Sequence, residues 1–179
     1  HYLAKNGVKY NEKGAWELVD RLSEAFQYYL LRASCDIAEE KGKCEYFDRT
    51  KYADGILPID HYKKEVDEIV PHKQRMAWES LRKDIAKYGL RHSTLSAQMP
   101  SESSSVVSNE TNGIEPPRAL RSIKKSKKGP LKQIAPGFPK LKNDYTLLWE
   151  MPSNEGYINV VAMMQKYFDQ AISGNWSYN

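Results

Sequence analysis

The sequence predicts an α/β fold in which a few short strands alternate with longer helices. Apolar residues recur every three or four positions in separate stretches, as the buried faces of helices do. Short apolar runs, such as Leu95 to Met99, lie between those stretches. Because strands separated by helices usually pair in parallel through helical crossovers, a mainly parallel sheet is favoured over a sandwich.

The first half of the chain predicts two amphipathic helices. The first runs from about Gly14 to Glu40 and ends at Gly42. The second begins after Pro71 and ends at Gly89, which is well placed to cap it. The apolar positions are Ala15, Leu18, Val19, Leu22, Phe26, Tyr29, Leu30, Ala33 and Ile37 in the first helix, and Trp78, Leu81, Ile85 and Tyr88 in the second.

The second half predicts a buried strand at Leu95 to Met99 and two further helices. A short helix covers Tyr145 to Trp149 and stops before Pro152. A last helix carries an apolar stripe whose methionines are interpreted as packing residues. Its members are Tyr157, Val161, Met164, Phe168 and Ile172.

One segment predicts antiparallel rather than parallel pairing. Ile123, followed by Leu131 and Ile134, flanks a lysine-rich turn with Gly129 and Pro130, which is typical of a β-hairpin. No acidic residue interrupts the basic positions Arg118, Arg121, Lys124, Lys125, Lys127, Lys128, Lys132, Lys140 and Lys142. Nucleic acid is one partner for such a charge. A solvated hairpin tip is the more common explanation, and a field that attracts anionic substrates is a third.

Composition indicates an ordinary globular protein. The chain has 179 residues, of which 40% are hydrophobic and 28% charged, enough for one domain or part of one. Cys35 and Cys44 have neither zinc nor redox-pair spacing and are interpreted as buried or half-buried thiols, and the four histidines predict no metal site. Without a signal peptide, a membrane span or a disulfide framework, we expect a cytoplasmic protein. Since the chain opens at His1, we also expect an internal piece of a longer polypeptide.

The segment from Pro100 to Ser105 is the candidate binding site. Pro100 suits a turn or a first helical position, Ser101 suits an N-cap, and Glu102 complements the positive end of a helix dipole. Amides at a helix start, surrounded by small hydroxyls such as those of Ser103 and Ser104, form a phosphate site. A polar linker is the alternative, because serine-rich runs are common in linkers. The adjoining Leu95 to Met99 argues against a linker, as do Val106 and Val107, which give the next segment something to bury.

Several separated motifs together resemble one family. MPSESSS with SNETNGIEPPR closely resembles the substrate-phosphate loop of the large, catalytic subunit of class I ribonucleotide reductase. GILPIDHYKKEVD, GLRHSTLSAQMPS, SIKKSKKG, LLWEMPSNEGY and MMQKYFDQAISGNWSYN resemble the same subunit in the same order, from about residue 13 onward. The lysine-rich form and the SGNWSYN ending are most similar to bacteriophage versions.

The resemblance implies a fold and an activity for the whole subunit. The fold would be a ten-stranded α/β barrel, of which residues 1–179 are part, with the basic hairpin projecting from it. The enzyme would convert ribonucleoside diphosphates to deoxyribonucleoside diphosphates by thiyl-radical chemistry, with a thioredoxin- or glutaredoxin-type reductant. Its radical cysteine, radical-relay tyrosines and C-terminal redox cysteines have no counterpart here, so no catalytic residue is assigned to this chain and the fragment alone is expected to be inactive.

The resemblance also implies partners and a substrate site. The substrate would bind at Pro100, Ser101, Glu102, Ser103 and Ser104. A small subunit with a di-metal centre would supply the radical, and nucleotide effectors such as ATP would bind elsewhere in a homodimer of large subunits. This segment itself is expected to bind no cofactor, and neither membrane nor nucleic acid is the expected partner.

Three functional hypotheses follow. The first is the substrate-binding portion of a ribonucleoside-diphosphate reductase. The second is a basic nucleic-acid-binding module, for which affinity would fall steeply with salt. The third is a catalytically incomplete split fragment with only a structural role.

Overall fold

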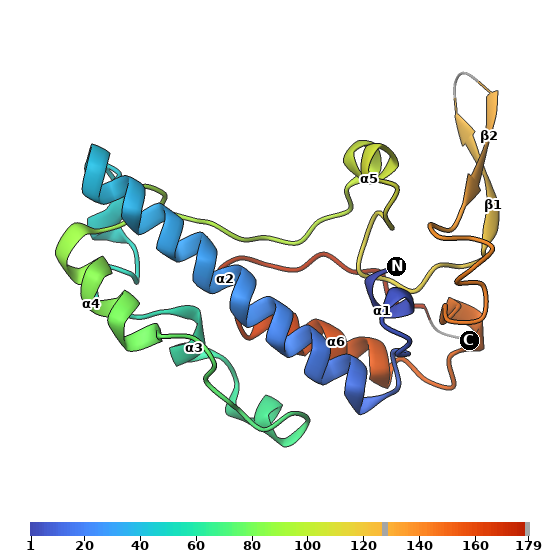
Figure 1. Cartoon of the computed structure of the whole chain (residues 1–179), viewed down its shortest axis with the longest axis horizontal. Coiled ribbons are helices and arrows are strands. Elements are labelled where there is room, and N and C mark those ends of the chain that lie inside the picture. Colours follow the sequence, from blue (N-terminus) through green and yellow to red (C-terminus); the bar gives the residue numbers. More distant parts are fainter. Residues whose placement is uncertain (127–128, 178–179) are drawn as a thin grey trace. The chain divides into compact units, whose positions relative to one another are not determined.

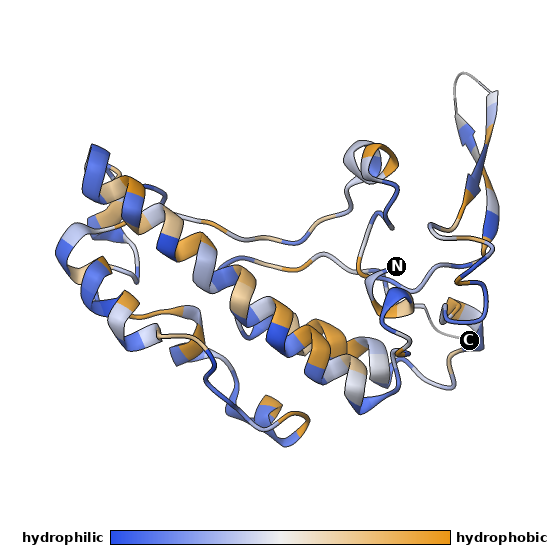
Figure 2. Ribbon diagram, viewed as in Figure 1, coloured by the Kyte–Doolittle hydropathy of each residue, from blue (hydrophilic) through white to orange (hydrophobic). Residues whose placement is uncertain are grey.

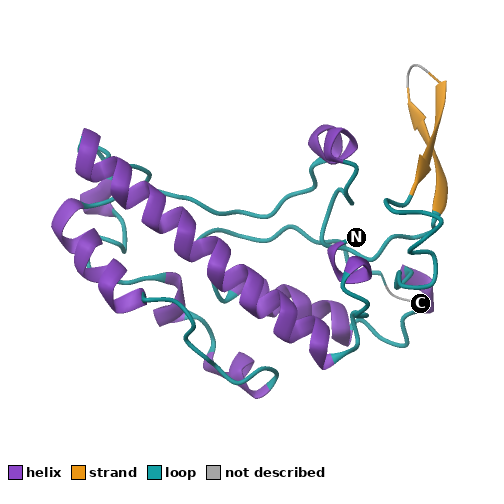
Figure 3. Ribbon diagram, in the orientation of Figure 1, coloured by secondary structure: helices purple, strands orange, loops and turns teal. Residues whose placement is uncertain are grey.

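The computed structural model describes residues 1–126 and 129–177 (Figure 1). In chain order the α-helices are α1 (Tyr2–Lys5), α2 (Lys13–Lys41), α3 (Pro58–His61), α4 (Trp78–Tyr88), α5 (Glu102–Ser108) and α6 (Glu155–Gln165). Short 3-10 helices cover η1 (Phe47–Arg49), η2 (Lys64–Glu68) and η3 (Leu148–Glu150), and the strands are β1 (Arg121–Ser126) and β2 (Gly129–Ile134). Long loops join most of these elements (Figure 3). No helix in the described ranges is long and apolar enough to cross a bilayer.

The chain packs as two units. One comprises 1–15, 99–161 and the described residues from 173 on, and holds α5, β1 and β2. The other comprises 16–98 and 162–172, and holds most of α2 together with α3 and α4. The second unit contains the main apolar core, which joins α2, η1, α3, α4 and the residues after α6. Its members are Leu31, Cys35, Phe47, Tyr52, Leu57, Ile59, Trp78, Leu81, Ile85, Leu90 and Tyr167.

The bounds of α2 agree with the prediction, but its buried face does not. Gly42 follows the helix with φ +82°, a conformation that glycine adopts at little cost. Leu22, Phe26 and Tyr29, which belong to the predicted apolar stripe, are exposed. The buried residues include Ala15, Val19, Leu31, Cys35 and Ala38, but also Asp20, Ser23, Glu24, Gln27 and Ser34. Figure 2 shows that hydrophilic and hydrophobic residues alternate along α2, while α6 is largely apolar.

The second predicted helix is confirmed from Trp78 onward, where α4 buries Trp78, Leu81 and Ile85. It begins later than the position after Pro71, because residues 71–77 form a loop. Gly89 ends the helix with φ +75° and ψ −163°, and its N–H donates to the Ile85 carbonyl at 2.8 Å. Glycine is required there because this region of backbone space is closed to other residues.

The predicted buried strand at Leu95 to Met99 is wrong. The segment has one isolated parallel bridge, between Gln98 and Ile172, and only Ser96 among its residues is buried. The N–H groups of Leu95 and Ser96 donate to the Asp169 carboxylate instead of to a neighbouring strand. The parallel sheet predicted from the alternation of elements is therefore absent from the described residues, where the one sheet is antiparallel.

The last two predicted helices are shorter than expected. Tyr145 to Trp149 contributes only the 3-10 helix η3 (Leu148–Glu150). Helix α6 ends at Gln165, so Phe168 and Ile172 lie beyond it. The Gln165 side-chain amide donates to the carbonyls of Phe168 and Gln170 at 3.4 and 3.0 Å, which stabilises the turn after the helix.

Strands β1 and β2 pair antiparallel as predicted, from Arg121 opposite Ile134 to Ser126 opposite Gly129. Gly129 and Pro130 lie inside β2 rather than in the turn. The tip residues Lys127 and Lys128 lie outside the described residues. Ile123, Leu131 and Ile134 are exposed, so this pair does not form a core of its own within its unit.

Candidate functional site

The predicted helix start at Pro100 to Ser105 is confirmed as the first turn of α5. Ser101 is the N-cap, and the Ser105 N–H donates the first intrahelical bond to the Ser101 carbonyl at 3.0 Å. The N–H groups of residues 102–104 precede that bond and lie at the positive end of the helix. The Ser101 N–H donates to the Asn112 carbonyl at 2.7 Å, which closes the loop from 101 to 112. The Ser101 N–H thus bonds to the loop, and the backbone N–H groups at the helix start are those of residues 102–104.

The side chains of this turn have different environments. Ser105 is buried and its hydroxyl donates to the Glu102 carbonyl at 3.1 Å, while Ser108 donates to the Ser104 carbonyl at 3.0 Å. Pro100, Ser101, Glu102, Ser103 and Ser104 are all exposed. Val106 and Val107 are also exposed, Val107 by 89%, so the prediction that they give this segment apolar side chains to bury is wrong. The exposed hydroxyls stand at the N-terminal end of α5, where the phosphate hypothesis needs them.

The loop after α5 is held by residues distant in sequence. Asn109 ends the helix in the left-handed conformation with φ +53°, which asparagine tolerates better than most residues. The Tyr10 hydroxyl donates to the Ile114 carbonyl at 2.6 Å. The Glu115 carboxylate accepts the backbone N–H and the side-chain amide of Asn175 at 2.9 and 2.6 Å. The return segment of the loop is thus fixed by side-chain hydrogen bonds rather than by a sheet.

Two tyrosines in the same unit, Tyr10 and Tyr157, do not serve as acids or bases near neutral pH. Burial raises the pKa of Tyr157 to about 12, with a further contribution from Glu115. Burial also raises the pKa of Tyr10, helped by Tyr157 and Glu115. Both phenols stay protonated, so Tyr10 acts as a hydrogen-bond donor that supports the loop.

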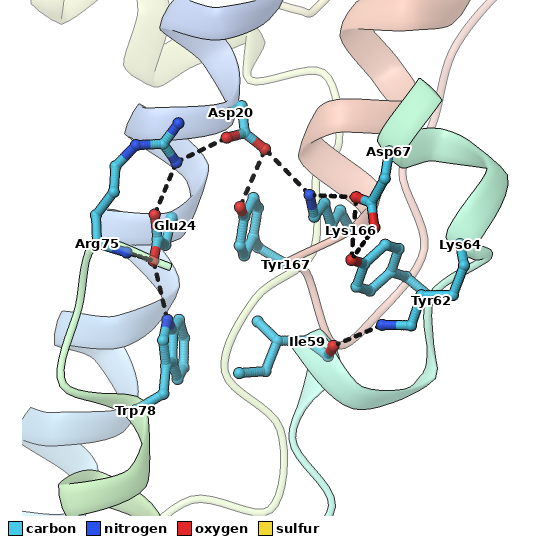
Figure 4. A network of polar contacts seen from close by, with 10 residues as sticks. All are labelled: Asp20, Glu24, Ile59, Tyr62, Lys64, Asp67, Arg75, Trp78, Lys166 and Tyr167. Atoms are coloured by element: carbon cyan, nitrogen blue, oxygen red, sulfur yellow. Dashed lines mark hydrogen bonds and ion pairs between the residues drawn. The ribbon is translucent and has the colours of Figure 1, made fainter. Parts of the chain in front are cut away.

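The second unit contains a buried network of charged groups (Figure 4). The Arg75 guanidinium lies 2.7 Å from the Asp20 carboxylate and 2.9 Å from that of Glu24, and both acids are fully buried. Glu24 also accepts the Trp78 indole N–H at 3.0 Å and the backbone N–H groups of Arg75 and Met76. Burial alone raises the pKa of Glu24, but these hydrogen bonds outweigh it and hold the pKa below its ordinary value.

Lys166 connects this cluster to η2. Its ammonium is buried, 2.8 Å from Asp67 Oδ1 and 3.6 Å from Asp20 Oδ1. The Tyr62 hydroxyl donates to Asp67 at 2.8 Å, and the Tyr167 hydroxyl donates to Asp20 at 3.0 Å. Burial raises the pKa of Asp67, but the bonds from Lys166 and Tyr62 bring it below its ordinary value. Each acidic side chain of the network lies beside a basic one, which suits a structural role.

This network is not among the sequence-predicted sites. The available signal was a polar stripe at Asp20, Glu24 and Gln27, which recurs at helical spacing like the apolar stripe on the same helix. Which of the two stripes is buried depends on where Arg75 and Lys166 lie. Arg75 is 51 residues from Glu24, and Lys166 is further still along the chain.

The two cysteines lie in or beside the main core. Cys35 is buried in the main core, where burial raises the pKa of its thiol. A thiol with a raised pKa is a poor nucleophile at neutral pH. Cys44 is half-buried beside the same core, and both cysteines are free. Across the described ranges, no group of three or more His, Cys, Asp or Glu residues has an arrangement that would hold a metal ion.

Known proteins are similar to this chain over its whole length. The family model for the barrel domain of ribonucleotide reductase matches residues 1–179. The ribonucleoside-diphosphate reductase subunit alpha of Haemophilus influenzae is 57% identical over 179 residues, and the ribonucleoside-diphosphate reductase 1 subunit alpha of Escherichia coli is 53% identical. The alpha subunit of Enterobacteria phage T4 is 42% identical over 180 residues. The bacterial relatives named here are thus more similar than the phage one, and a bacteriophage type stays a prediction.

The chain covers 24% of the length of each of these relatives, while they cover 99% or more of the chain. The match extends over both units and includes the α5 turn and the hairpin. The chain therefore belongs to the ribonucleotide reductase barrel-domain family and corresponds to a part of the alpha, or large, subunit.

Proposed function

We propose that these residues form the substrate-phosphate-binding portion of a ribonucleoside-diphosphate reductase large subunit. The whole enzyme would convert ribonucleoside diphosphates to deoxyribonucleoside diphosphates by thiyl-radical chemistry. The observation that carries this proposal is the match of the chain to the family over its full length. The serine-rich turn that resembles the family's phosphate loop is the first turn of α5, which supports it. Residues 1–179 would be part of a ten-stranded barrel from which β1 and β2 project.

The remaining machinery would come from elsewhere in the enzyme. The radical cysteine and its relay would lie in other parts of the large subunit, and a small subunit with a di-metal centre would generate the radical. Nucleotide effectors would bind outside this segment, in a large subunit that forms a homodimer. No cofactor is assigned to the residues described above.

The substrate diphosphate would bind at the first turn of α5. The backbone N–H groups of residues 102–104 point toward the helix start, where an anion is stabilised by the helix dipole. The hydroxyls of Ser103 and Ser104 would add hydrogen bonds, and Ser101 would shape the turn through its bond to Asn112. Glu102 would point away from the diphosphate, since its carboxylate would repel it. There it would stabilise the helix start by about 0.3–1 kcal/mol.

Replacing Ser104 by alanine tests this site in the complete enzyme. A hydrogen bond to a charged group contributes about 1.5–3 kcal/mol, so Ser104→Ala should weaken substrate binding about tenfold to a hundredfold. The loss should be equal for all four bases, because a phosphate carries no base information. Binding of each ribonucleoside diphosphate is measured by calorimetry, alongside the melting temperature, which should hardly change because Ser104 is exposed.

Ser108→Ala is the matched control. Ser108 lies on the same helix and donates to the Ser104 carbonyl, but it is at the opposite end from the proposed phosphate. It should leave substrate affinity unchanged. Equal affinities of the wild type and Ser104→Ala for every substrate would refute the phosphate assignment.

A further inference from the structure

The start of α5 is bonded to the segment that returns from the helix. The Ser101 N–H donates to the Asn112 carbonyl at 2.7 Å, so the N-cap residue is tied directly to the return segment, residues 112–115. These residues all belong to the same unit. The position of the serine turn, residues 100–105, therefore depends on what holds the return segment.

Tyr10 holds the return segment through its side chain. Its hydroxyl donates to the Ile114 carbonyl at 2.6 Å, across 104 residues of sequence. The Tyr10 ring packs edge-on against that of Tyr157, with the ring centroids 6.2 Å apart, and Tyr157 is fully buried. Because the ring rests on a buried side chain, its hydroxyl is held in one place as a donor. Burial also raises the pKa of Tyr10, so the hydroxyl keeps its proton through the neutral range.

Glu115 fixes the next residue of the return segment by a second contact. Its Oε1 accepts the Asn175 backbone N–H at 2.9 Å and the Asn175 side-chain amide at 2.6 Å. A carboxylate makes stronger hydrogen bonds than a neutral acceptor, and two donors from one residue also fix its orientation. The other oxygen lies close to the loop, since a Cβ at Gly113 would be 3.1 Å from Glu115 Oε2. Two successive residues of the return segment are thus held by residues distant in sequence.

We propose that Tyr10 and Glu115 are positioning residues for the serine turn. They act through Asn112, whose carbonyl holds the Ser101 N–H. Only one residue separates Asn112 from Ile114, so a shift of the return segment reaches Ser101 through a very short connection. This inference rests on the function proposed above. If the diphosphate binds at the serine turn, a displaced Ser101 should weaken its binding, because the backbone N–H groups that follow would point elsewhere.

The test uses the complete large subunit with its small subunit and compares two tyrosines that each donate to a backbone carbonyl. Tyr10→Phe removes the hydroxyl that bonds to Ile114 and keeps the ring. Tyr145→Phe is the matched control, because the Tyr145 hydroxyl donates to the Pro136 carbonyl at 2.8 Å in the same unit. Each change removes one hydrogen bond, so each should lower the melting temperature. Only Tyr10→Phe should raise KM, about threefold to tenfold and equally for every ribonucleoside diphosphate, with kcat changed far less.

A second set of variants tests Glu115 and decides the matter if Tyr10→Phe does not fold. Asn175→Asp replaces the donating amide by a carboxylate that faces the one of Glu115, so KM should rise about tenfold. Adding Glu115→Gln restores the contact, because an amide at position 115 can accept the backbone N–H and donate to the new carboxylate. The double variant should therefore return KM toward the wild-type value.

The outcomes separate this inference from the function on which it rests. If Ser104→Ala leaves binding intact, the phosphate site fails and the positioning role fails with it. If Ser104→Ala weakens binding but Tyr10→Phe raises KM no more than Tyr145→Phe does, the role of Tyr10 is overturned and the phosphate site stands. The role of Glu115 is overturned in the same way if Asn175→Asp leaves KM unchanged, or if Glu115→Gln does not lower the raised value.

Discussion

At the scale of single residues, burial decides which ion pairs matter. Asp20 and Glu24 have no exposed surface and pair with Arg75. The carboxylates of other ion pairs in the described residues, those of Asp36, Asp48 and Glu79, are more than half exposed. A buried ion pair adds little to the free energy of unfolding compared with well-packed apolar side chains of similar volume. Removing one partner is costly, because the remaining charge stays buried.

Arg75→Met should therefore lower the free energy of unfolding by about 3 kcal/mol, because the buried Glu24 carboxylate loses its cation and Asp20 loses the nearer of its two cations. Arg32→Met is the matched control. The Arg32 side chain is 27% exposed against 22% for Arg75, and it also pairs with two carboxylates, but its partners Asp36 and Asp84 are 56% and 36% exposed. Its loss should cost about 1 kcal/mol or less. Urea unfolding measures both variants, and equal costs would contradict the structural role assigned to the network.

At the scale of elements, two glycines end the helices that pack on the main core. Gly42 follows α2 with φ +82°, and a Cβ at this position would have no neighbouring atom within 4 Å. Gly89 follows α4 with φ +75°, and a Cβ there would lie 2.7 Å from Lys43 Cβ. Glycine is thus needed at position 42 only for its backbone conformation. At position 89 it is needed both for the backbone conformation and because a side chain would collide with Lys43.

Gly89→Ala should consequently destabilise the chain more than Gly42→Ala. The left-handed conformation costs an alanine about 1–2 kcal/mol, which is the expected loss at Gly42. At Gly89 the ψ of −163° is open only to glycine, and the Lys43 side chain must also move, so we expect about 3 kcal/mol. Thermal unfolding followed by circular dichroism compares the two. A Gly42→Ala variant as unstable as Gly89→Ala would show that the contact with Lys43 is unimportant.

At the scale of the whole molecule, the chain spans about a quarter of the length of the relatives it matches. Leu22, Phe26 and Tyr29 leave an apolar face of α2 exposed, with Phe26 49% accessible. The described cysteines are a buried core thiol and a half-buried one, and both are free. The inactivity expected of this chain alone belongs to this scale, because it concerns what the rest of such a subunit would supply.

The isolated 179-residue chain should form no deoxynucleotide, even with small subunit, effector and reductant present. The motif around the family's radical cysteine has no counterpart in these residues, and the raised pKa of Cys35 keeps that thiol protonated. Conversion of a labelled ribonucleoside diphosphate, followed by chromatography, is the measurement. Deoxynucleotide formation above that of a Cys35→Ser, Cys44→Ser chain would contradict it.

Local pattern was sufficient for features that depend on neighbouring residues. The bounds of α2, the face of α4, the cap at Gly89, the helix start at Ser101 and the pairing of β1 with β2 agree with the sequence-based predictions. Helix bonds join residues four apart, a glycine acts on the helix end next to it, and β1 and β2 follow one another along the chain. The motifs around the serine turn also identified the family, since their order along the chain is itself part of the sequence.

The sequence by itself therefore determined the family, the main helices and the position of the serine turn. Only the tertiary structure decided that α2 buries Asp20 and Glu24 and exposes Phe26, because the compensating charges come from Arg75 and Lys166. It also decided that Leu95 to Met99 is not a strand, because the amides of Leu95 and Ser96 donate to the side chain of Asp169, which is 74 residues from Leu95. A polar group is stable in a core only when it has partners, and an extended segment forms a strand only when another segment pairs with it. For α2 and for residues 95–99 the partners are distant in sequence, so no local pattern contains that information.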